Sequence, residues 1–218
     1  MTSRSPAPQA PRPDLGDLSA GTTDQLVAHA DLDGLRFDEP AGSLLALADA
    51  TLRSCLVARA RFENVDAQRS TLRDVCWERP ELVSLRGWRA RWRDVIFDGG
   101  RIGVLESYTS TWSCVALRGV KASYVNLRGS ELVDVTVADS QIDELDLSEA
   151  TGKRVALPGS RIDRLVVHQS SVSALDLRAA EIGELVWAGT LTGVVLSHDQ
   201  AVDLAPELAR QAGARVEG

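Results

Sequence analysis

The sequence predicts an all-β fold in which the chain winds into a four-sided parallel β-solenoid. One observation is an apolar residue that recurs at every fifth position between Leu32 and Trp187. The other is a second set of inward residues that sorts by size in steps of twenty. Neither the 3.6-residue period of a helix nor the two-residue period of a flat strand produces this spacing. A repeat with these two periods is typical of a solenoid.

The five-residue period assigns two buried positions to each unit. The central residues include Phe37, Leu47 and Leu52, and their flanking positions are mostly polar. A second inward residue lies two positions before each central one, as Leu45 does before Leu47. Each unit therefore buries two side chains and exposes three.

The twenty-residue period fixes four units to a coil. Read in steps of twenty, two columns are mostly small and two are mostly branched; two of them begin Ala50, Ser70, Ala90, Ser110 and Cys55, Val75, Val95, Val115. Residues that share a column pack on one another in successive coils, so the cross-section is square and its interior is filled. With a ladder spacing of about 4.8 Å, roughly eight coils form a rod of about 40 Å.

Glycines mark the corners of this square. They share the position two after the central residue, where a corner with positive φ favours glycine: Gly34, Gly99, Gly119, Gly129, Gly159 and Gly189.

The interior contains a local exchange of volume. Ala67, Gly87 and Ser107 form a column of small central residues, and Trp92 and Trp112 stack on the next wall. We expect the two indoles to lie across the space that the small residues leave. The alternative is unselected variation in a tolerant core.

The two ends need caps, because a β-solenoid otherwise exposes unpaired edges. Residues 1–22 are rich in proline and are expected to be a disordered tail, and residues 23–196 form the solenoid with a short N-terminal cap at Thr23–Ala30. Residues 197–218 are expected to be helical. Ser197 or Asp199 would begin one helix, Pro206 a second short one, and Gly213 would end it. This segment is a cap or a dimerisation element, with Val202, Leu204 and Leu208 as its apolar contacts.

The units resemble the pentapeptide-repeat family, with Ala30-Asp31-Leu32-Asp33-Gly34 as the clearest match. The resemblance covers about residues 30–196 and implies a right-handed quadrilateral β-helix. Among family members, the Qnr-type proteins, which are linked to quinolone resistance, resemble duplex DNA in size and charge and bind type II topoisomerases. The resemblance therefore implies DNA gyrase as a partner. Two departures weaken that implication: Val or Leu replaces Ala on half of the walls, and the long loops of some Qnr-type members are missing.

The composition predicts a cytoplasmic protein without direct nucleic-acid or membrane binding. The net charge is -7, and the sequence contains neither a long apolar run nor an apolar signal segment. Three cysteines, Cys55, Cys76 and Cys114, lack the spacing of a metal or disulfide site.

No catalytic centre, cofactor or metal is predicted. His29, His168 and His198 lie far apart in the sequence, and a filled solenoid offers no concave pocket for acid–base chemistry.

Charge distinguishes two surface regions. One coil carries acidic residues without Lys or Arg among them, and it is the candidate acidic partner surface: Glu131, Asp134, Asp139, Asp143, Glu144, Asp146 and Glu149. The candidate basic ladder, Arg53, Arg73 and Arg93, repeats every twenty residues near the outward Trp88 and is suited to phosphate or an acidic partner. Ordinary solvated surface is the alternative for both.

The sequence thus predicts a non-enzymatic protein-binding rod. The first hypothesis is that it modulates a type II topoisomerase by DNA mimicry, and the alternative is a cytoplasmic interaction scaffold with an unrelated partner. A homodimer through the C-terminal segment remains open.

Overall fold

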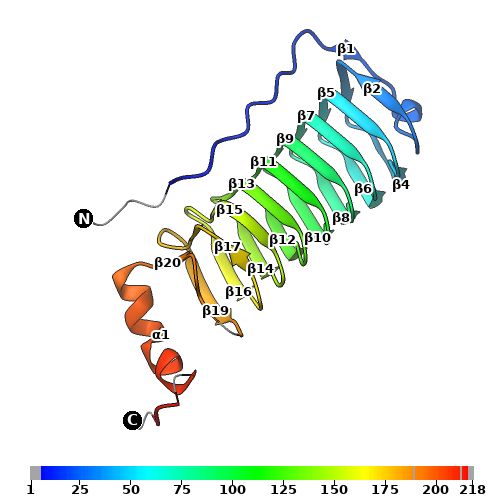
Figure 1. The fold of residues 1–218 in the computed structure, drawn as a ribbon. Helices are drawn as coiled ribbons and strands as arrows, with labels where there is room; N and C mark the ends of the chain where they lie inside the picture. The colour runs from blue at the N-terminus through cyan, green and yellow to red at the C-terminus, as the bar shows by residue number, and fades with distance from the viewer. Residues whose placement is uncertain (1–5, 189, 212, 216–218) are drawn as a thin grey trace.

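The computed structural model describes residues 6–188, 190–211 and 213–215 and shows a parallel β-solenoid of about nine turns. The strands form a 12-stranded and an 8-stranded sheet, with parallel pairing throughout the described ladders. Figure 1 shows the turns stacked into a rod with the C-terminal helix at one end. The predicted fold class is confirmed, with about one turn more than expected.

The two sheets alternate along the chain. The 12-stranded sheet contains β1 (Ser19–Ala20), β2 (Asp31–Asp33), β3 (Leu35–Asp38), β5 (Thr51–Ala58), β7 (Thr71–Glu78), β9 (Arg91–Asp98), β11 (Thr111–Arg118), β13 (Glu131–Ala138), β15 (Thr151–Ala156), β17 (Ser171–Val172), β18 (Leu175–Asp176) and β20 (Val194–Val195). The 8-stranded sheet contains β4 (Ala41–Ala46), β6 (Arg61–Asp66), β8 (Glu81–Arg86), β10 (Arg101–Glu106), β12 (Lys121–Asn126), β14 (Gln141–Asp146), β16 (Arg161–Val166) and β19 (Glu181–Val186).

The register confirms the twenty-residue coil. Leu52 pairs with Leu72, and Trp92 pairs with Trp112. Residues twenty positions apart lie one above another in successive coils. The inward residues of the columns therefore join into one continuous core.

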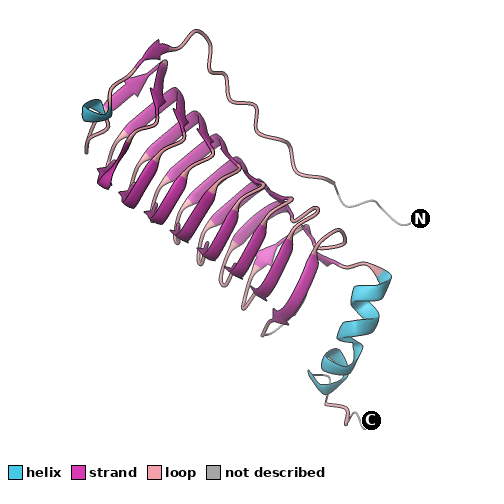
Figure 2. Ribbon diagram, turned by 180° about the vertical axis from the view of Figure 1, so that it is seen from behind, coloured by secondary structure: helices cyan, strands magenta, loops and turns pink. Residues whose placement is uncertain are grey.

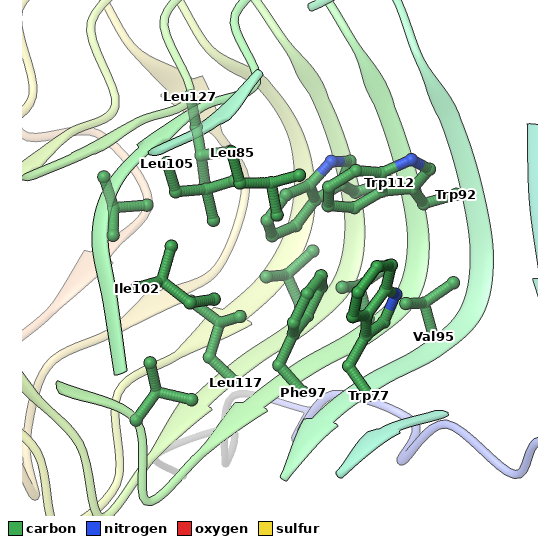
Figure 3. Packing of buried hydrophobic residues seen from close by; sticks show 14 of the residues in the cluster. Trp77, Leu85, Trp92, Val95, Phe97, Ile102, Leu105, Trp112, Leu117 and Leu127 are labelled. Carbon is green, nitrogen blue, oxygen red and sulfur yellow. The ribbon is translucent and has the colours of Figure 1, made fainter. Parts of the chain in front are cut away.

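Aromatic side chains fill the middle of this core as predicted. The rings of Trp92 and Trp112 stack at 5.0 Å between centroids, and Figure 3 shows them side by side. A Cβ added to Gly87 would lie 2.7 Å from Cζ2 of Trp92, so the indole occupies the space that the glycine leaves. The nearby stack of Trp77 and Phe97, at 5.9 Å, extends the aromatic filling.

Three of the four corners use the left-handed conformation. The predicted corner glycines have positive φ at Gly34, Gly99, Gly119, Gly129 and Gly159, while Gly189 lies outside the described residues. Many non-glycine residues adopt the same conformation at equivalent corners, as Arg79 does at φ 46°. Glycine therefore marks only part of the corner set, because neighbouring coils hold the other residues in the strained conformation.

The N-terminal segment differs from the predicted disordered tail. Its described part, residues 6–18, runs along the outside of the rod toward the C-terminal end (Figures 1 and 2). The main-chain nitrogens of Gln9, Arg12 and Asp14 donate hydrogen bonds to the solenoid. We call residues 6–15 the strap. The partners of the strap are side chains far away in the sequence, which supply hydrogen bonds that the segment cannot make by itself.

Strand β1 and a 3-10 turn close the N-terminal end of the rod. β1 pairs with β3, and the turn at Thr23–Gln25 precedes Leu26, which is 3% exposed. The reciprocal hydrogen bonds of a capping box join Thr22 and Gln25. This region is the location that the sequence predicts for the N-terminal cap.

The C-terminal segment forms one helix, α1 (His198–Gln211), with Pro206 inside it. The predicted division into two short helices is therefore wrong. Ser197 begins the helix through reciprocal hydrogen bonds with Gln200, whose side-chain amide also donates to the carbonyls of Leu177 and Ala180. These two bonds fix the first turn of α1 to the last coils, so the helix continues past a proline that sequence rules place at a helix start.

Candidate binding surface

The described residues do not form a metal centre, and the three histidines lie apart, with His29 and His168 in the solenoid and His198 at the start of α1. Within residues 6–188, 190–211 and 213–215, no group of three or more His, Cys, Asp or Glu side chains could hold a metal ion. No helix in this part of the chain is long and apolar enough to cross a membrane.

A broad open depression of about 720 Å³ lies over β6, β8 and β10. Its floor is low because Gly42, Gly100 and Gly103 lack side chains, and Val83 stands exposed inside it. Its charged lining contains two residues of each sign: Arg61, Glu63, Glu81 and Arg101. The described lining contains no histidine, cysteine or hydroxyl side chain, and its carboxylates are those of Glu63 and Glu81.

A stacked aromatic corner is the most distinctive outward feature. Trp88 and Tyr108 follow β8 and β10 at equivalent outward positions, twenty residues apart. Their rings lie almost parallel, with 6.2 Å between centroids and 6° between planes. The repeat itself causes this stack, because it places the two side chains one above the other.

Two arginines complete this surface, which we call the aromatic corner: Arg69, Trp88, Arg89 and Tyr108. Each guanidinium lies 5.5 Å from the centre of the Trp88 ring. Asp49 holds Arg69 through two hydrogen bonds of 2.7 and 2.6 Å, and the bond from Arg69 lowers the pKa of the Asp49 carboxyl. In the described part of the chain, Arg89 has no carboxylate partner, so its charge is available to a ligand.

The predicted basic ladder is aligned but neutralised. Arg53, Arg73 and Arg93 pair in register within the 12-stranded sheet. Arg53 contacts Asp31 at 2.6 Å, and Arg73 and Arg93 contact the carboxylates that follow them at 3.3 and 3.5 Å. The ladder therefore does not present three free charges to a phosphate.

The predicted acidic surface divides into paired and unpaired carboxylates. Asp134 is only 3% exposed and bonds to Arg154, so its assignment to a partner surface is wrong. The strap and Arg154 cover this corner, which the sequence pattern could not distinguish from an exposed one. Glu144 and Glu149 form ion pairs with Arg164 and Arg128. The remaining four form no ion pair with another described residue: Glu131, Asp139, Asp143 and Asp146.

The three predicted contacts of the C-terminal segment face different surroundings. Leu204 packs against the core, and it borders a cavity of about 220 Å³ between α1 and the last turns. Val202 and Leu208 are 56% and 38% exposed. Leu204 thus acts as a cap contact, and dimerisation through the other two remains a prediction.

The strand register and the five-residue burial pattern together decide the fold. The chain has the pentapeptide-repeat fold. No protein-family model matches the sequence, and no curated protein matches it.

Solved structures that are similar to this chain include two proteins of known name. A structure of QnrB1, described as a plasmid-mediated fluoroquinolone resistance protein, is 12% identical; the match covers 86% of this chain and 100% of that one, with a TM-score of 0.32. HetL from a Nostoc cyanobacterium, a pentapeptide repeat protein involved in regulating heterocyst differentiation, is 13% identical; the match covers 76% of this chain and 86% of that one, with a TM-score of 0.26. At these TM-scores the fold assignment depends on the register and burial described above.

Proposed function

We propose that this chain is a non-catalytic protein-binding rod whose binding surface is centred on the aromatic corner. The observation that carries the proposal is the outward stack of Trp88 on Tyr108, with two arginine side chains lying over the Trp88 ring. Tryptophan, tyrosine and arginine are the residues that contribute most energy at protein interfaces. The stack is also rigid before binding, so little side-chain entropy is lost when a partner docks.

The interior supports a role for the outer faces. The buried positions of successive coils form one apolar cluster from Leu26 to Trp187. The buried polar side chains are mostly serines, whose hydroxyls bond to the chain itself, as Ser130 does to the carbonyl of Ser107 at 2.9 Å. A core filled in this way leaves ligand recognition to the surface.

The chemistry of the corner defines the partner. Arg89 offers a guanidinium without a described carboxylate partner over the Trp88 ring, and Arg69 is held in place by Asp49. A partner segment that combines a carboxylate with an apolar or aromatic side chain would satisfy both features. We therefore propose an acidic, aromatic-containing protein surface as the ligand.

Quantitative affinity capture from the native cell tests this function. We expect the Trp88→Ala and Arg89→Ala variants to lose the partners that the unchanged chain enriches, by about tenfold or more. Arg91→Ala is the matched control, since Arg91 is also exposed and lies close in sequence. Equal capture by all variants, with melting curves that confirm their folding, would reject the aromatic corner as the binding centre.

A second candidate function is modulation of DNA gyrase or another type II topoisomerase. The four unpaired carboxylates of one coil, on a rod of net charge -7, favour this hypothesis. A rod that mimics DNA would compete with duplex DNA for the enzyme through such carboxylates.

A supercoiling assay separates the two candidates. We expect the rod to inhibit gyrase, and the combined change Glu131→Gln, Asp139→Asn, Asp143→Asn and Asp146→Asn to remove that inhibition. Neutralising Glu63 and Glu81, two exposed carboxylates on other coils, is the control. If the unchanged rod neither inhibits nor binds the enzyme, the topoisomerase hypothesis is wrong, whereas the aromatic corner keeps its own test.

A further inference from the structure

The strap lies on one corner of the 12-stranded sheet and is held by a repeated contact. The main-chain nitrogens of Asp14, Arg12 and Gln9 donate to Oδ1 of Asp74, Asp94 and Asp134 at 3.2, 3.4 and 2.9 Å. These three aspartates occupy equivalent corner positions on three of four successive coils, and each has a φ between 51° and 58°. One column of corner residues therefore forms a row of acceptors along the rod. Figures 1 and 2 show the extended strap along this side.

The spacing of the row fits a polyproline II helix. From Asp14 to Gln9 the strap advances five residues while the rod advances three coils, from Asp74 to Asp134. Five residues of polyproline II span about 15 Å, and three ladder spacings span about 14 Å. A proline-rich segment in this conformation therefore advances along the rod at nearly the same rate as the row of acceptors.

The one coil in this span without a carboxylate lies between the contacts of Arg12 and Gln9. Cys114 occupies the corner position between Asp94 and Asp134. The strap passes it between Arg12 and Gln9, where Pro11 is buried and has no N–H group to donate. Acceptors are therefore present at the three coils where the strap donates, and the coil without one lies beside a stretch of the strap that contains a proline.

Arginines hold the row of acceptors in position. Arg73 and Arg93 contact Oδ2 of Asp74 and Asp94, the oxygens that the strap does not use. Arg154 donates to Oδ2 of Asp134 at 2.7 Å. Two of the three members of the basic ladder thus position the carboxylates, which explains the twenty-residue spacing of these arginines without a phosphate ligand.

The contacts recognise the main chain of the strap more than its side chains. The donors are backbone nitrogens, and the side chains of Gln9, Arg12 and Asp14 belong to exposed residues. Pro8, Pro11 and Pro13 are the less exposed positions. Another proline-rich segment with the same spacing of N–H groups would meet the same acceptors.

We propose that this corner is a docking groove for extended proline-rich segments, occupied here by the chain's own strap and available to a proline-rich segment of a partner protein. The strap is a tethered competitor, since its linker keeps it at a high effective concentration. Partner binding then depends on displacing the strap. The groove lies on a different face from the aromatic corner and does not depend on the function proposed for that corner.

Cutting the tether in the full-length protein provides the test. A protease site inserted between Gly16 and Asp17 falls at an exposed position where an added Cβ would meet nothing within 4 Å. The probe is a fluorescent synthetic peptide with the sequence of residues 6–15, and its anisotropy reports binding. We expect the cleaved protein to bind the probe at least about tenfold more tightly than the uncleaved protein, because the tethered strap no longer competes.

Matched variants examine the acceptor row. Asp94→Gly removes the carboxylate while keeping a residue that tolerates positive φ, and should weaken probe binding about tenfold. Asp139→Gly makes the same change at an exposed corner away from the strap and should leave binding unchanged. Equal affinity of both variants would overturn the role of the acceptors.

Two further peptides and one thiol complete the test. A peptide with alanine in place of Gln9, Arg12 and Asp14 should bind within about twofold of the probe, while methylation of the Arg12 nitrogen should abolish binding. Bound peptide should also slow alkylation of Cys114. If the alanine peptide does not bind, the groove recognises only the sequence of its own strap. If two copies exchange straps and form a dimer, the proposal that the groove binds a segment of another protein is wrong. No binding to the cleaved protein would overturn the docking groove itself.

Discussion

Trp112 donates its indole N–H to the hydroxyl of Ser107, five residues earlier, at 3.0 Å inside the core. Ser107 in turn donates to the carbonyl of Gly87 at 3.1 Å. One hydroxyl therefore provides hydrogen-bond partners for the indole N–H of Trp112 and for the Gly87 carbonyl. Both Ser107 and Trp112 are completely buried. Ser107 therefore contributes hydrogen bonds to the core in addition to its small volume.

The Ser107→Ala variant should lose about 1–3 kcal/mol of unfolding free energy, because the indole nitrogen of Trp112 would remain buried without an acceptor. Urea denaturation monitored by tryptophan fluorescence measures the change. Ser123→Ala, at an exposed position on the neighbouring sheet, is the control and should stay within about 0.5 kcal/mol. A loss no larger than that of the control would contradict the role of this hydrogen bond.

Gly87→Ala should destabilise the chain by about 1–3 kcal/mol through overpacking. The added Cβ would lie 2.7 Å from Cζ2 of Trp92, inside a column where the indole cannot withdraw. Differential scanning calorimetry measures the loss, and the double variant Gly87→Ala/Trp92→Leu should recover part of it. If the double variant is no more stable than the sum of the single changes predicts, the two residues are not coupled.

Two opposite substitutions test the strain at the corners. Arg79 has φ 46° and Gly119 has φ 61° at equivalent corners, and an added Cβ at Gly119 meets only the Cα of Gly99, at 3.9 Å. Arg79→Gly should therefore stabilise by up to about 1 kcal/mol, whereas Gly119→Ala should destabilise by about 1 kcal/mol. Denaturant midpoints measure both changes in stability. If both substitutions change the stability in the same direction, positive φ at the corner does not decide the effect.

The stability of the fold should depend on Asp134 at low pH. Hydrogen bonds from Arg154 and from the main chain of Gln9 lower the pKa of the Asp134 carboxyl, against the opposite effect of burial. Its contribution is present above the unfolded pKa of about 3.9 and is lost as the pH falls through the lower folded value. Denaturation between about pH 5 and about pH 2 should therefore show a shallower loss of stability for Asp134→Asn than for the unchanged chain. Asp143→Asn, at an exposed carboxylate, is the control, and identical slopes for both variants would contradict this linkage.

Cys76 should react slowly with thiol reagents in the folded protein. Burial, with further contributions from Asp98 and Glu78, raises the pKa of its thiol to about 11. The thiolate is the reactive form, so at about pH 8 only a very small fraction can react. Alkylation followed by mass spectrometry should show fast modification after denaturation and slow modification before it. Rapid modification of Cys76 in the folded chain would contradict the prediction.

The candidate surfaces could be predicted only in part. Repeat spacing alone places Trp88 on the outside and Arg53, Arg73 and Arg93 in one column, as the structure confirms. The spacing does not reveal that Tyr108 stacks on Trp88, although both positions were readable as outward and twenty apart. Nor does it reveal that Asp134 is buried, because a corner carboxylate becomes buried only when the strap and Arg154 cover it.

The sequence by itself determined the solenoid, its coil length, its inward columns and the packing of Trp92 across Gly87. These features follow from contacts between residues five and twenty positions apart, and such short, repeated distances leave a periodic signal. The tertiary structure alone decided the place of the strap, whose acceptors lie 60, 82 and 125 residues away, and the single helix α1, which Gln200 fixes to carbonyls 20 and 23 residues earlier. Each of these contacts occurs once or joins segments that do not share a repeat period. Periodicity in the sequence therefore does not predict them.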